Sequence, residues 1–257
     1  MISTKLPRQS SIMTVMTKSA IKASRGLLRD FNELENLQVS VKSNKTFVTG
    51  ADLNADSLLR KELLFARPNY SILTEESGET KGTNPDYKWI IDPLDGTVNY
   101  MHGFPHWAIS IALEKQGEIV AAVTYDPLKN EMFWAEKGYG AYLNDRKIRV
   151  SGKNKLDDVL VSFCSHNPTV ESLASQRVRK SGCMTLDMAY LAAGRLDIIY
   201  GSAAPNDWDI AAGSLLIREA GGVLADKSGK PVSSYKEAKI MTNLSLLPFA
   251  EKFVHQN

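Results

Sequence analysis

The chain has 257 residues, of which 43% are hydrophobic and 23% are charged. This composition is typical of globular proteins and excludes the collagen, coiled-coil and disordered classes. The formal net charge of +2 gives no electrostatic case for wrapping nucleic acid or adhering to a membrane surface. The only two cysteines, Cys164 and Cys183, exclude a disulfide framework and favour the cytoplasm, and no apolar run reaches the roughly 20 residues of a membrane helix.

The N-terminal segment allows two interpretations. Before Asp30 it has basic and hydroxyl side chains but no acidic ones, which is typical of an organelle transit peptide. Its apolar residues, however, recur at helical spacing, which favours an amphipathic helix of the mature fold. These residues are Ile12, Met16, Ala20, Ala23, Leu27, Phe31 and Leu34.

Further elements follow from periodicity and from turn residues. A second helix is predicted from Asp52, as its N-cap, to about Ala66, and Gln116-Gly117 predicts a hairpin. Strands are predicted at Ser71–Thr74, Trp89–Asp92, Ala108–Leu113, Ile119–Tyr125, Glu131–Ala135, Val159–Phe163, Ile198–Tyr200, Val223–Ala225 and Ile240–Thr242. Helices are predicted at Thr185–Ala193, Asp209–Ala220 and about Leu246–Phe253. Strands early and alternation later indicate layered helices and sheets, divided near residue 145 into parts 1–145 and 146–257.

Three acidic segments carry the candidate chemistry: Leu73–Glu79, Trp89–Thr97 and Trp208–Gly213. In the middle one an apolar strand is expected to end at Asp92, and Pro93 then forces a turn. Asp95 follows three residues after Asp92, so the two carboxylates can converge. The backbone N–H groups of the next two residues, Gly96 and Thr97, suit a phosphate. Because carboxylates beside a phosphate repel it unless cations intervene, oxygen ligands here favour Mg²⁺.

Each acidic segment also has a purely structural interpretation. The middle one is compatible with an ordinary Asx-turn, and the pair Glu75-Glu76 with a solvated loop. Asp209 is compatible with a simple helix N-cap. The occurrence of all three segments in this order favours a site over three unrelated turns.

At these segments the chain resembles the inositol monophosphatase family, which includes bacterial extragenic suppressor proteins. The family belongs to a wider set of Mg²⁺-dependent, lithium-sensitive sugar and nucleotide phosphatases. The resemblance runs from about Val41 to the C-terminus and is closest in the run from Ile91 to Tyr100. It implies an α+β sandwich with layers α-β-α-β-α and a site between two lobes. Residues 1–145 would supply most metal ligands, and residues 146–257 would supply Asp209 and the substrate-side residues.

The resemblance also implies a role for individual residues. Two or three Mg²⁺ ions would be held by Glu75, Asp92, the Leu94 carbonyl, Asp95 and Asp209. Phosphate oxygens would be bound by Gly96, Thr97 and Lys42. Glu75 and Thr97, with Asp52 behind Thr97, would orient the attacking water and accept its proton, without a phosphoenzyme. The charges agree, since four carboxylates and a phosphate monoester approach neutrality with two or three Mg²⁺ ions.

The substrate side departs from the family pattern. The resemblance assigns substrate contacts to Asp95, Gly182, Cys183, Met184 and Ser202. Family members specific for inositol carry a glutamate where this chain has Gly201 or Ser202, and Met184 is bulkier than the usual alanine. Inositol 1-phosphate is therefore the default substrate. A 3′(2′),5′-bisphosphate nucleotidase and a fructose-1,6-bisphosphatase remain alternatives.

Other functions and sites were weighed as well. The resemblance implies a homodimer and, as a function of another class, binding to a protein partner in RNA metabolism. His102 and His106 are four residues apart, but Gly103 and Pro105 disfavour the helix that would align them on a metal. Gly138-Tyr139-Gly140 is interpreted as a turn, and Cys183 as a buried thiol rather than a nucleophile.

Overall fold

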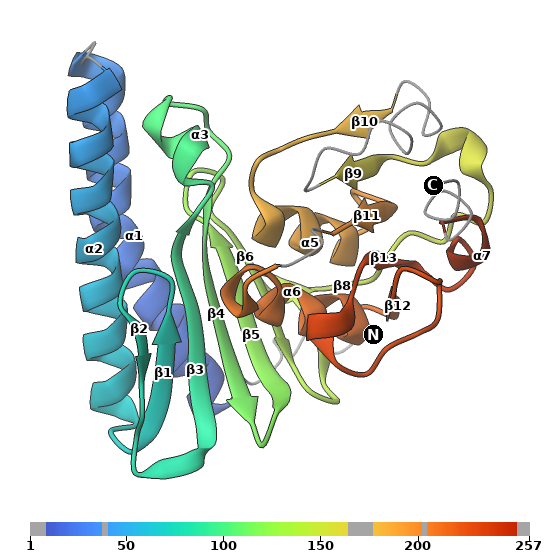
Figure 1. The fold of residues 1–257 in the computed structure, drawn as a ribbon, viewed down its shortest axis with the longest axis horizontal. Coiled ribbons are helices and arrows are strands. Elements are labelled where there is room, and N and C mark those ends of the chain that lie inside the picture. The colour runs from blue at the N-terminus through green and yellow to red at the C-terminus, as the bar shows by residue number, and fades with distance from the viewer. Residues whose placement is uncertain (1–8, 38–40, 164–176, 202–204, 251–257) are drawn as a thin grey trace, which may run out of the picture.

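The computed structural model describes residues 9–37, 41–163, 177–201 and 205–250. Its elements form five layers: two long helices, an eight-stranded sheet, two more helices, a five-stranded sheet and a short helix (Figure 1). The helices are α1 (Ser11–Leu37), α2 (Val41–Ala66), α3 (Thr97–Met101), α5 (Met184–Ala192), α6 (Asp207–Glu219) and α7 (Leu247–Ala250), with 3-10 turns at Leu156–Asp158 and Tyr235–Glu237. This order of layers confirms the predicted α+β sandwich of the type α-β-α-β-α.

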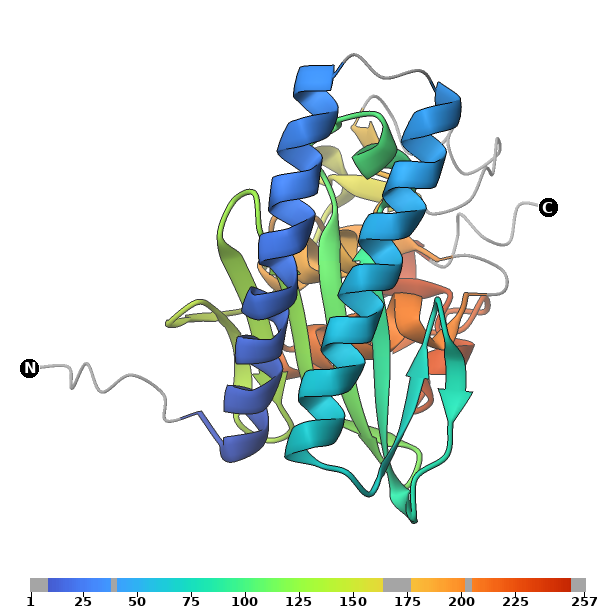
Figure 2. The same ribbon diagram turned by 90° about the vertical axis from the view of Figure 1, so that its left-hand side faces the viewer.

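The first layer is the pair α1 and α2, which run side by side across one face of the larger sheet (Figure 2). The predicted N-terminal amphipathic helix is confirmed, because its apolar stripe is the buried face of α1. Of the predicted stripe, Met16, Ala20, Ala23, Leu27 and Phe31 are each at most 2% exposed, Ile12 is only half-buried, and the side chain of Leu34 lies outside the described residues. Met13, which was not predicted, is fully buried beside them. Burial of such a stripe against a sheet is the main source of stability for a helix of this kind.

The predicted start of the second helix is wrong. Helix α2 begins at Val41, so Asp52 lies inside it and is not its N-cap. Asp52 and Asp56, one turn apart, are only 3% and 2% exposed on the helix face toward the acidic loop after β1 (Tyr70–Thr74). Tertiary packing explains the error. In the sequence, Asp52 resembles a helix N-cap, but in the structure it faces the acidic loop after β1.

The larger sheet lies between two helical layers. Its order is β2-β1-β3-β4-β5-β6-β7-β8, with β1 and β3 parallel and every other neighbouring pair antiparallel. Besides β1, its strands are β2 (Gly78–Thr80), β3 (Asn84–Asp95), β4 (Ala108–Lys115), β5 (Glu118–Asp126), β6 (Glu131–Glu136), β7 (Gly140–Leu143) and β8 (Arg146–Ile148). The hairpin at Gln116-Gly117 is confirmed, with φ of 51° and 83° at the two turn residues.

The smaller sheet has the order β10-β9-β11-β13-β12. Its strands are β9 (Val161–Phe163), β10 (Val178–Arg179), β11 (Ile198–Tyr200), β12 (Gly222–Ala225) and β13 (Ile240–Asn243). The sequence prediction missed β2, β7, β8 and β10. Each has at most four residues, and β2, β8 and β10 are largely exposed, so their composition carries no strand pattern.

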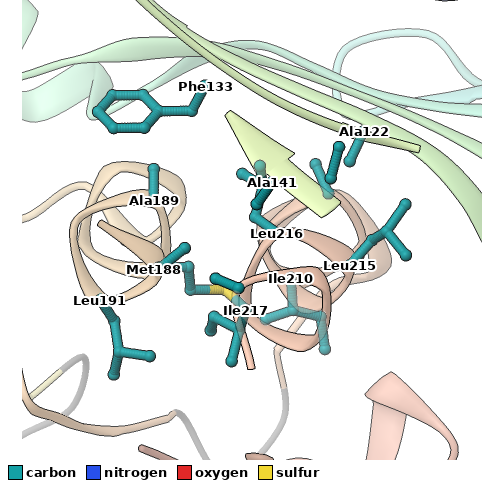
Figure 3. Close-up of a cluster of buried hydrophobic side chains, with 14 of the residues drawn as sticks. Ala122, Phe133, Ala141, Met188, Ala189, Leu191, Ile210, Leu215, Leu216 and Ile217 are labelled. Atoms are coloured by element: carbon teal, nitrogen blue, oxygen red, sulfur yellow. The ribbon is translucent and has the colours of Figure 1, made fainter. Parts of the chain in front are cut away.

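Helices α5 and α6 fill the space between the two sheets. Figure 3 shows Met188 and Ala189 of α5 beside Leu216 and Ile217 of α6, beneath Phe133 of the larger sheet. All positions of α6 from Ile210 to Ile217 are buried, as expected for a helix covered on every side. The central layer therefore joins the two sheets into one packed unit.

The predicted division near residue 145 stays a prediction. The larger sheet ends with β8 at Ile148, and the smaller sheet starts at Val161. Among the described residues, no helix combines the length and apolar character that crossing a bilayer requires.

Candidate active site

Asp92 and Asp95 lie together because strand β3 has a bulge between them. Asp92 pairs with Ser110 and Asp95 with Ala108, so two residues of β3 oppose one of β4. One of those two is Pro93, which has no N–H to donate to the ladder. In a regular strand, residues three apart face opposite sides, whereas the extra residue of a bulge turns them to the same side. The strand thus continues to Asp95, beyond the predicted end at Asp92.

Glu75 is brought to the same place by strand pairing. Strand β1 runs parallel to β3 with Thr74 opposite Ile91, and the Glu75 N–H donates to the Ile91 carbonyl oxygen at 3.2 Å. Loss of surrounding water, followed by repulsion from Asp209, Glu76 and Asp95, raises the pKa of Glu75 to about 7. Glu75 and Glu76 are exposed, so the loop after β1 is solvated and at the same time borders the carboxylate cluster.

Asp92 is the buried centre of this cluster. It is 1% exposed, and its Oδ1 accepts the Leu94 N–H at 3.0 Å. Burial raises its pKa well above the ordinary value, and repulsion from Asp95 and Glu75 raises it further. Such mutual repulsion is what a bound cation removes, since it converts crowded carboxylates into ligands.

Asp209 joins the cluster from α6, a helix of the central layer. It is the third residue of α6, and its Oδ2 accepts the Asn206 N–H at 3.0 Å in a capping box. Asn206 is therefore the N-cap, and the interpretation of Asp209 as a simple N-cap is wrong. Burial raises the pKa of Asp209, and repulsion from Asp95 contributes to the increase.

The donor set fits divalent cations in its chemistry. The structure brings together the four predicted carboxylates and the Leu94 carbonyl, all of them hard oxygen donors. Within the described residues, no three His, Cys, Asp or Glu side chains already have the arrangement that holds a metal ion. Oδ2 of Asp95 and Oδ2 of Asp209 accept N–H groups instead. The ligand roles therefore stay predictions.

Gly96 and Thr97 form a tight turn beside these carboxylates. Gly96 is the N-cap of α3 with φ of 90°, a left-handed conformation. A Cβ atom there would lie 2.9 Å from the His106 carbonyl oxygen, so only glycine fits. The first N–H groups of a helix have no partner within it, which leaves those of this turn available to an anion.

The structure does not bring Asp52 into hydrogen-bond contact with Thr97. The Thr97 hydroxyl donates to the Leu94 carbonyl oxygen at 2.9 Å. Asp52 instead forms a side-chain hydrogen bond with Glu76, and burial together with repulsion from Glu76 and Glu75 raises its pKa to about 8. The role of Asp52 behind Thr97 stays a prediction that needs a change of hydroxyl partner.

The predicted substrate segment contacts Asp95 directly. Asp95 Oδ2 accepts the Thr185 N–H at 2.7 Å and lies 3.2 Å from Cys183 Sγ. Gly182 is exposed, Cys183 is buried and Met184 is half-buried, so the three differ in access to a ligand. Burial, with repulsion from Asp95, raises the pKa of the Cys183 thiol well above its usual value. A protonated, buried thiol agrees with the interpretation that Cys183 is not a nucleophile.

Two predicted site residues cannot be placed. Ser202 lies outside the described residues. Lys42 lies in α2, in a part of the helix whose side chains are not described. Their predicted roles are unchanged.

The structure adds residues that sequence reasoning missed. Glu76 binds Asp52, and Asp56 accepts a hydrogen bond from Ser77. The spacing of Asp52 and Asp56, one helical turn apart, was the available indication. Thr185 was missed because it acts through its backbone N–H, which no side-chain pattern reveals.

Two further segments were weighed as alternative sites: the pair His102 and His106, and the run Gly138-Tyr139-Gly140. His102 and His106 do not join any potential metal-binding group among the described residues. Gly138-Tyr139-Gly140 is a turn, as predicted, between β6 and β7.

Comparison with known proteins identifies the family to which the chain belongs. The model of the inositol monophosphatase family matches residues 8–253. The chain belongs to the inositol monophosphatase family. An inositol-1-monophosphatase of Rhizobium meliloti is 44% identical over 240 residues, covering 88% of this chain and 90% of that protein. A protein of Xylella fastidiosa named Nus factor SuhB is 43% identical over 234 residues, covering 86% and 84% of the two chains.

Solved structures agree with this membership of the inositol monophosphatase family. The extragenic suppressor protein suhB from Bartonella henselae has a TM-score of 0.85 at 39% identity and covers 96% of this chain and 100% of that chain. The inositol monophosphatase from Anabaena has a TM-score of 0.80 at 30% identity, covering 95% and 94%. The chain is therefore a phosphoric monoester hydrolase of a family that is generally metal-dependent.

Proposed function

We propose that this enzyme hydrolyses the phosphate monoester of a polyol, with inositol 1-phosphate as the first substrate to test and Mg²⁺ as the cofactor. The carrying observation is the convergence of Glu75, Asp92, Asp95 and Asp209 beside the turn at Gly96. Relatives at 44% identity that are named inositol-1-monophosphatases support the choice of substrate.

Each predicted site residue has a role that follows from its chemistry. The N–H groups of Gly96 and Thr97 bind phosphate oxygens, and Lys42 adds a positive charge. Glu75 and Thr97 hold the attacking water in line with the phosphorus and take its proton, without a covalent intermediate. Cations held by the four carboxylates and the Leu94 carbonyl would neutralise the phosphate and lower the pKa of a bound water. The alcohol would be contacted by residues of the substrate side, for which the resemblance names Asp95, Gly182, Cys183, Met184 and Ser202.

The test of this proposal is phosphate release from a panel of esters. Inositol 1-phosphate, 3′-phosphoadenosine 5′-phosphate and fructose 1,6-bisphosphate are compared with Mg²⁺, with EDTA, and with added Li⁺. The expected result is Mg²⁺-dependent, Li⁺-inhibited release that is fastest from inositol 1-phosphate. Preference for either other ester would replace the substrate and keep the mechanism, whereas release unaffected by EDTA would contradict the cofactor.

The role of Asp95 is tested by Asp95→Asn. The amide oxygen can still accept the Thr185 N–H, but the charge that holds a cation is lost. We expect kcat to fall more than about a hundredfold while the circular dichroism spectrum stays unchanged. Asp145→Asn, at an exposed position in the β7–β8 turn, is the matched control. Wild-type turnover of Asp95→Asn at saturating Mg²⁺ would contradict the assignment.

A second candidate function is binding to a protein partner in RNA metabolism. It is favoured by relatives named Nus factor SuhB at up to 43% identity. If the Asp95→Asn protein rescued a deletion strain from its mutant phenotype, the partner role would be the physiological one. We also propose that the protein is a homodimer and that it is located in the cytoplasm. Sedimentation velocity tests the oligomeric state.

A further inference from the structure

Asn99 connects the two sides of the candidate site through its side-chain amide. It lies on α3, two residues after Thr97. Its Nδ2 donates to the His106 carbonyl oxygen at 2.7 Å and to the Ser181 carbonyl oxygen at 2.7 Å. The first bond closes the loop after α3, and the second reaches the segment that precedes α5. One amide group therefore holds the phosphate-side turn against the alcohol-side segment.

The partner segment is fitted closely to this amide. Gly182 has φ of 74°, and a Cβ atom there would lie 3.2 Å from Asn99 Oδ1. Ser181 is also held from its other side, because its hydroxyl donates to Asp187 Oδ1 at 2.7 Å. Asp187 is 3% exposed and accepts a second hydroxyl, that of Ser162, at 2.5 Å. Ser181 is thus fixed between Asn99 and a buried carboxylate.

A second connection between the two sides depends on a predicted metal ligand. Asp95 Oδ2 accepts the Thr185 N–H and contacts Cys183 Sγ. Asp95 is also a predicted cation ligand, so this connection shares its carboxylate with the candidate metal site. The Asn99 amide is neutral, and both of its acceptors are backbone carbonyls, so its connection does not depend on the cation.

We propose that Asn99 is a positioning residue that sets the spacing between the phosphate-binding turn at Gly96-Thr97 and the alcohol-side residues 182–184. It thereby determines the KM for substrates whose alcohol is large enough to reach that segment. This inference rests on the proposed phosphatase function. Its physical reason is that a small misplacement of positioning groups weakens every contact that depends on them.

The test uses Asn99→Asp, which keeps the shape but puts a carboxylate oxygen against two carbonyl oxygens. The matched control is Asn243→Asp, because Asn243 Nδ2 also donates to two carbonyl oxygens, those of Ser151 and Lys153 at 2.8 and 2.9 Å. Asn243 lies on β13 of the smaller sheet, and the side chains of Ser151 and Lys153 contact Asp197, which is not one of the candidate site carboxylates. Asn99→Ala removes the connection without adding charge, in case the aspartate variant fails to fold.

We expect the KM for inositol 1-phosphate to rise at least about tenfold in Asn99→Asp and Asn99→Ala. The KM for methyl phosphate, whose alcohol is too small to reach residues 182–184, and the Ki of inorganic phosphate should change less than about twofold. In Asn243→Asp, all three values should stay within about twofold. An equal change for the large and the small ester, or an equal change in the control, would overturn the proposal.

A second measurement separates this proposal from the proposed function. Hydrogen exchange of the backbone amides at residues 181–185 should accelerate in both Asn99 variants and not in Asn243→Asp, whatever the enzyme hydrolyses. Unchanged exchange there would overturn the positioning role. Accelerated exchange in the Asn99 variants, together with no turnover of any ester by the wild-type enzyme, would instead reject the proposed substrate class.

Discussion

Asp92 and Asp95 lie together because Pro93 and Leu94 leave the ladder between β3 and β4. A single extra residue in the strand therefore decides which side two carboxylates face. At the next position, Gly96 can approach the His106 carbonyl only because it has no side chain. The three-residue spacing of Asp92 and Asp95 places both carboxylates on one side of the strand because the strand has a bulge between them. The left-handed Gly96 then turns the chain directly after Asp95.

Gly96→Ala tests this arrangement. Gly117→Ala is the matched control, since Gly117 also has a positive φ, of 83°, but has open space around it. We expect Gly117→Ala to lower the free energy of unfolding by about 1–2 kcal/mol through backbone strain alone. Gly96→Ala should cost about 1–3 kcal/mol more through crowding.

Urea denaturation measures both free energies, and phosphate release measures activity. Only Gly96→Ala should lose turnover, because only that turn carries the N–H groups that we propose bind phosphate. Equal stability losses in the two variants would show that the approach to His106 does not constrain the turn.

At the scale of the elements, α6 is held at both ends by polar contacts. At its start, the capping box of Asn206 and Asp209 directs one carboxylate toward the site. At its end, Glu219 accepts the N–H groups of Gly138 and Gly140 at 2.8 and 2.7 Å. The Gly-Tyr-Gly turn thus connects the larger sheet to the central helix layer.

Glu219→Ala should lower the free energy of unfolding by about 1–3 kcal/mol, because two backbone donors lose a charged acceptor. Glu219→Gln keeps one carbonyl oxygen and should lose less. Since the turn lies at the end of α6 away from Asp209, kcat should stay unchanged in both variants. Thermal and urea denaturation give the stabilities, and a large fall in kcat with normal stability would contradict a structural role.

At the scale of the whole molecule, α2, the larger sheet and the central helix α6 bring like charges together in one cluster. Burial raises the pKa of Asp52 from 3.8 to about 8 and that of Glu75 from 4.5 to about 7. The folded protein therefore holds protons that the unfolded chain releases above about pH 4. The stability from these groups is fully present below their ordinary pKa values, and it is lost as the pH rises toward 8. Bound Mg²⁺ should reverse that loss, because it binds the deprotonated carboxylates.

The measurement is the Tm between pH 5 and pH 8, with Mg²⁺ and with EDTA at equal ionic strength. We expect the difference in Tm to be small at pH 5. At pH 8, it should reach about 5–10 °C when Mg²⁺ exceeds its Kd about a hundredfold. Sodium chloride at the same ionic strength is the control. A Mg²⁺ effect that is as large at pH 5 as at pH 8 would contradict the linkage.

The sequence could predict much of the fold and part of the site. Helix α1 was predicted because its apolar stripe repeats at helical spacing over many turns. The central strands were predicted because they are continuous apolar runs, as strands covered on both faces must be. The acidic segments were identified because three of them follow one another in a particular order along the chain, and the middle one continues into a glycine turn. Short exposed strands such as β2 and β8 carry no such pattern.

The sequence by itself indicated layered helices and sheets, because these depend on local periodicity. Its short motifs carried the resemblance to the family, and that resemblance implied the order of the layers and the candidate carboxylates. Only the tertiary structure decided that Asp52 lies inside α2 and binds Glu76, since burial overrides the local preference for a helix start. It also decided that Asn99 holds Ser181, 82 residues away. Contacts through backbone atoms of distant segments leave no trace in composition or spacing, because any residue can supply a carbonyl oxygen.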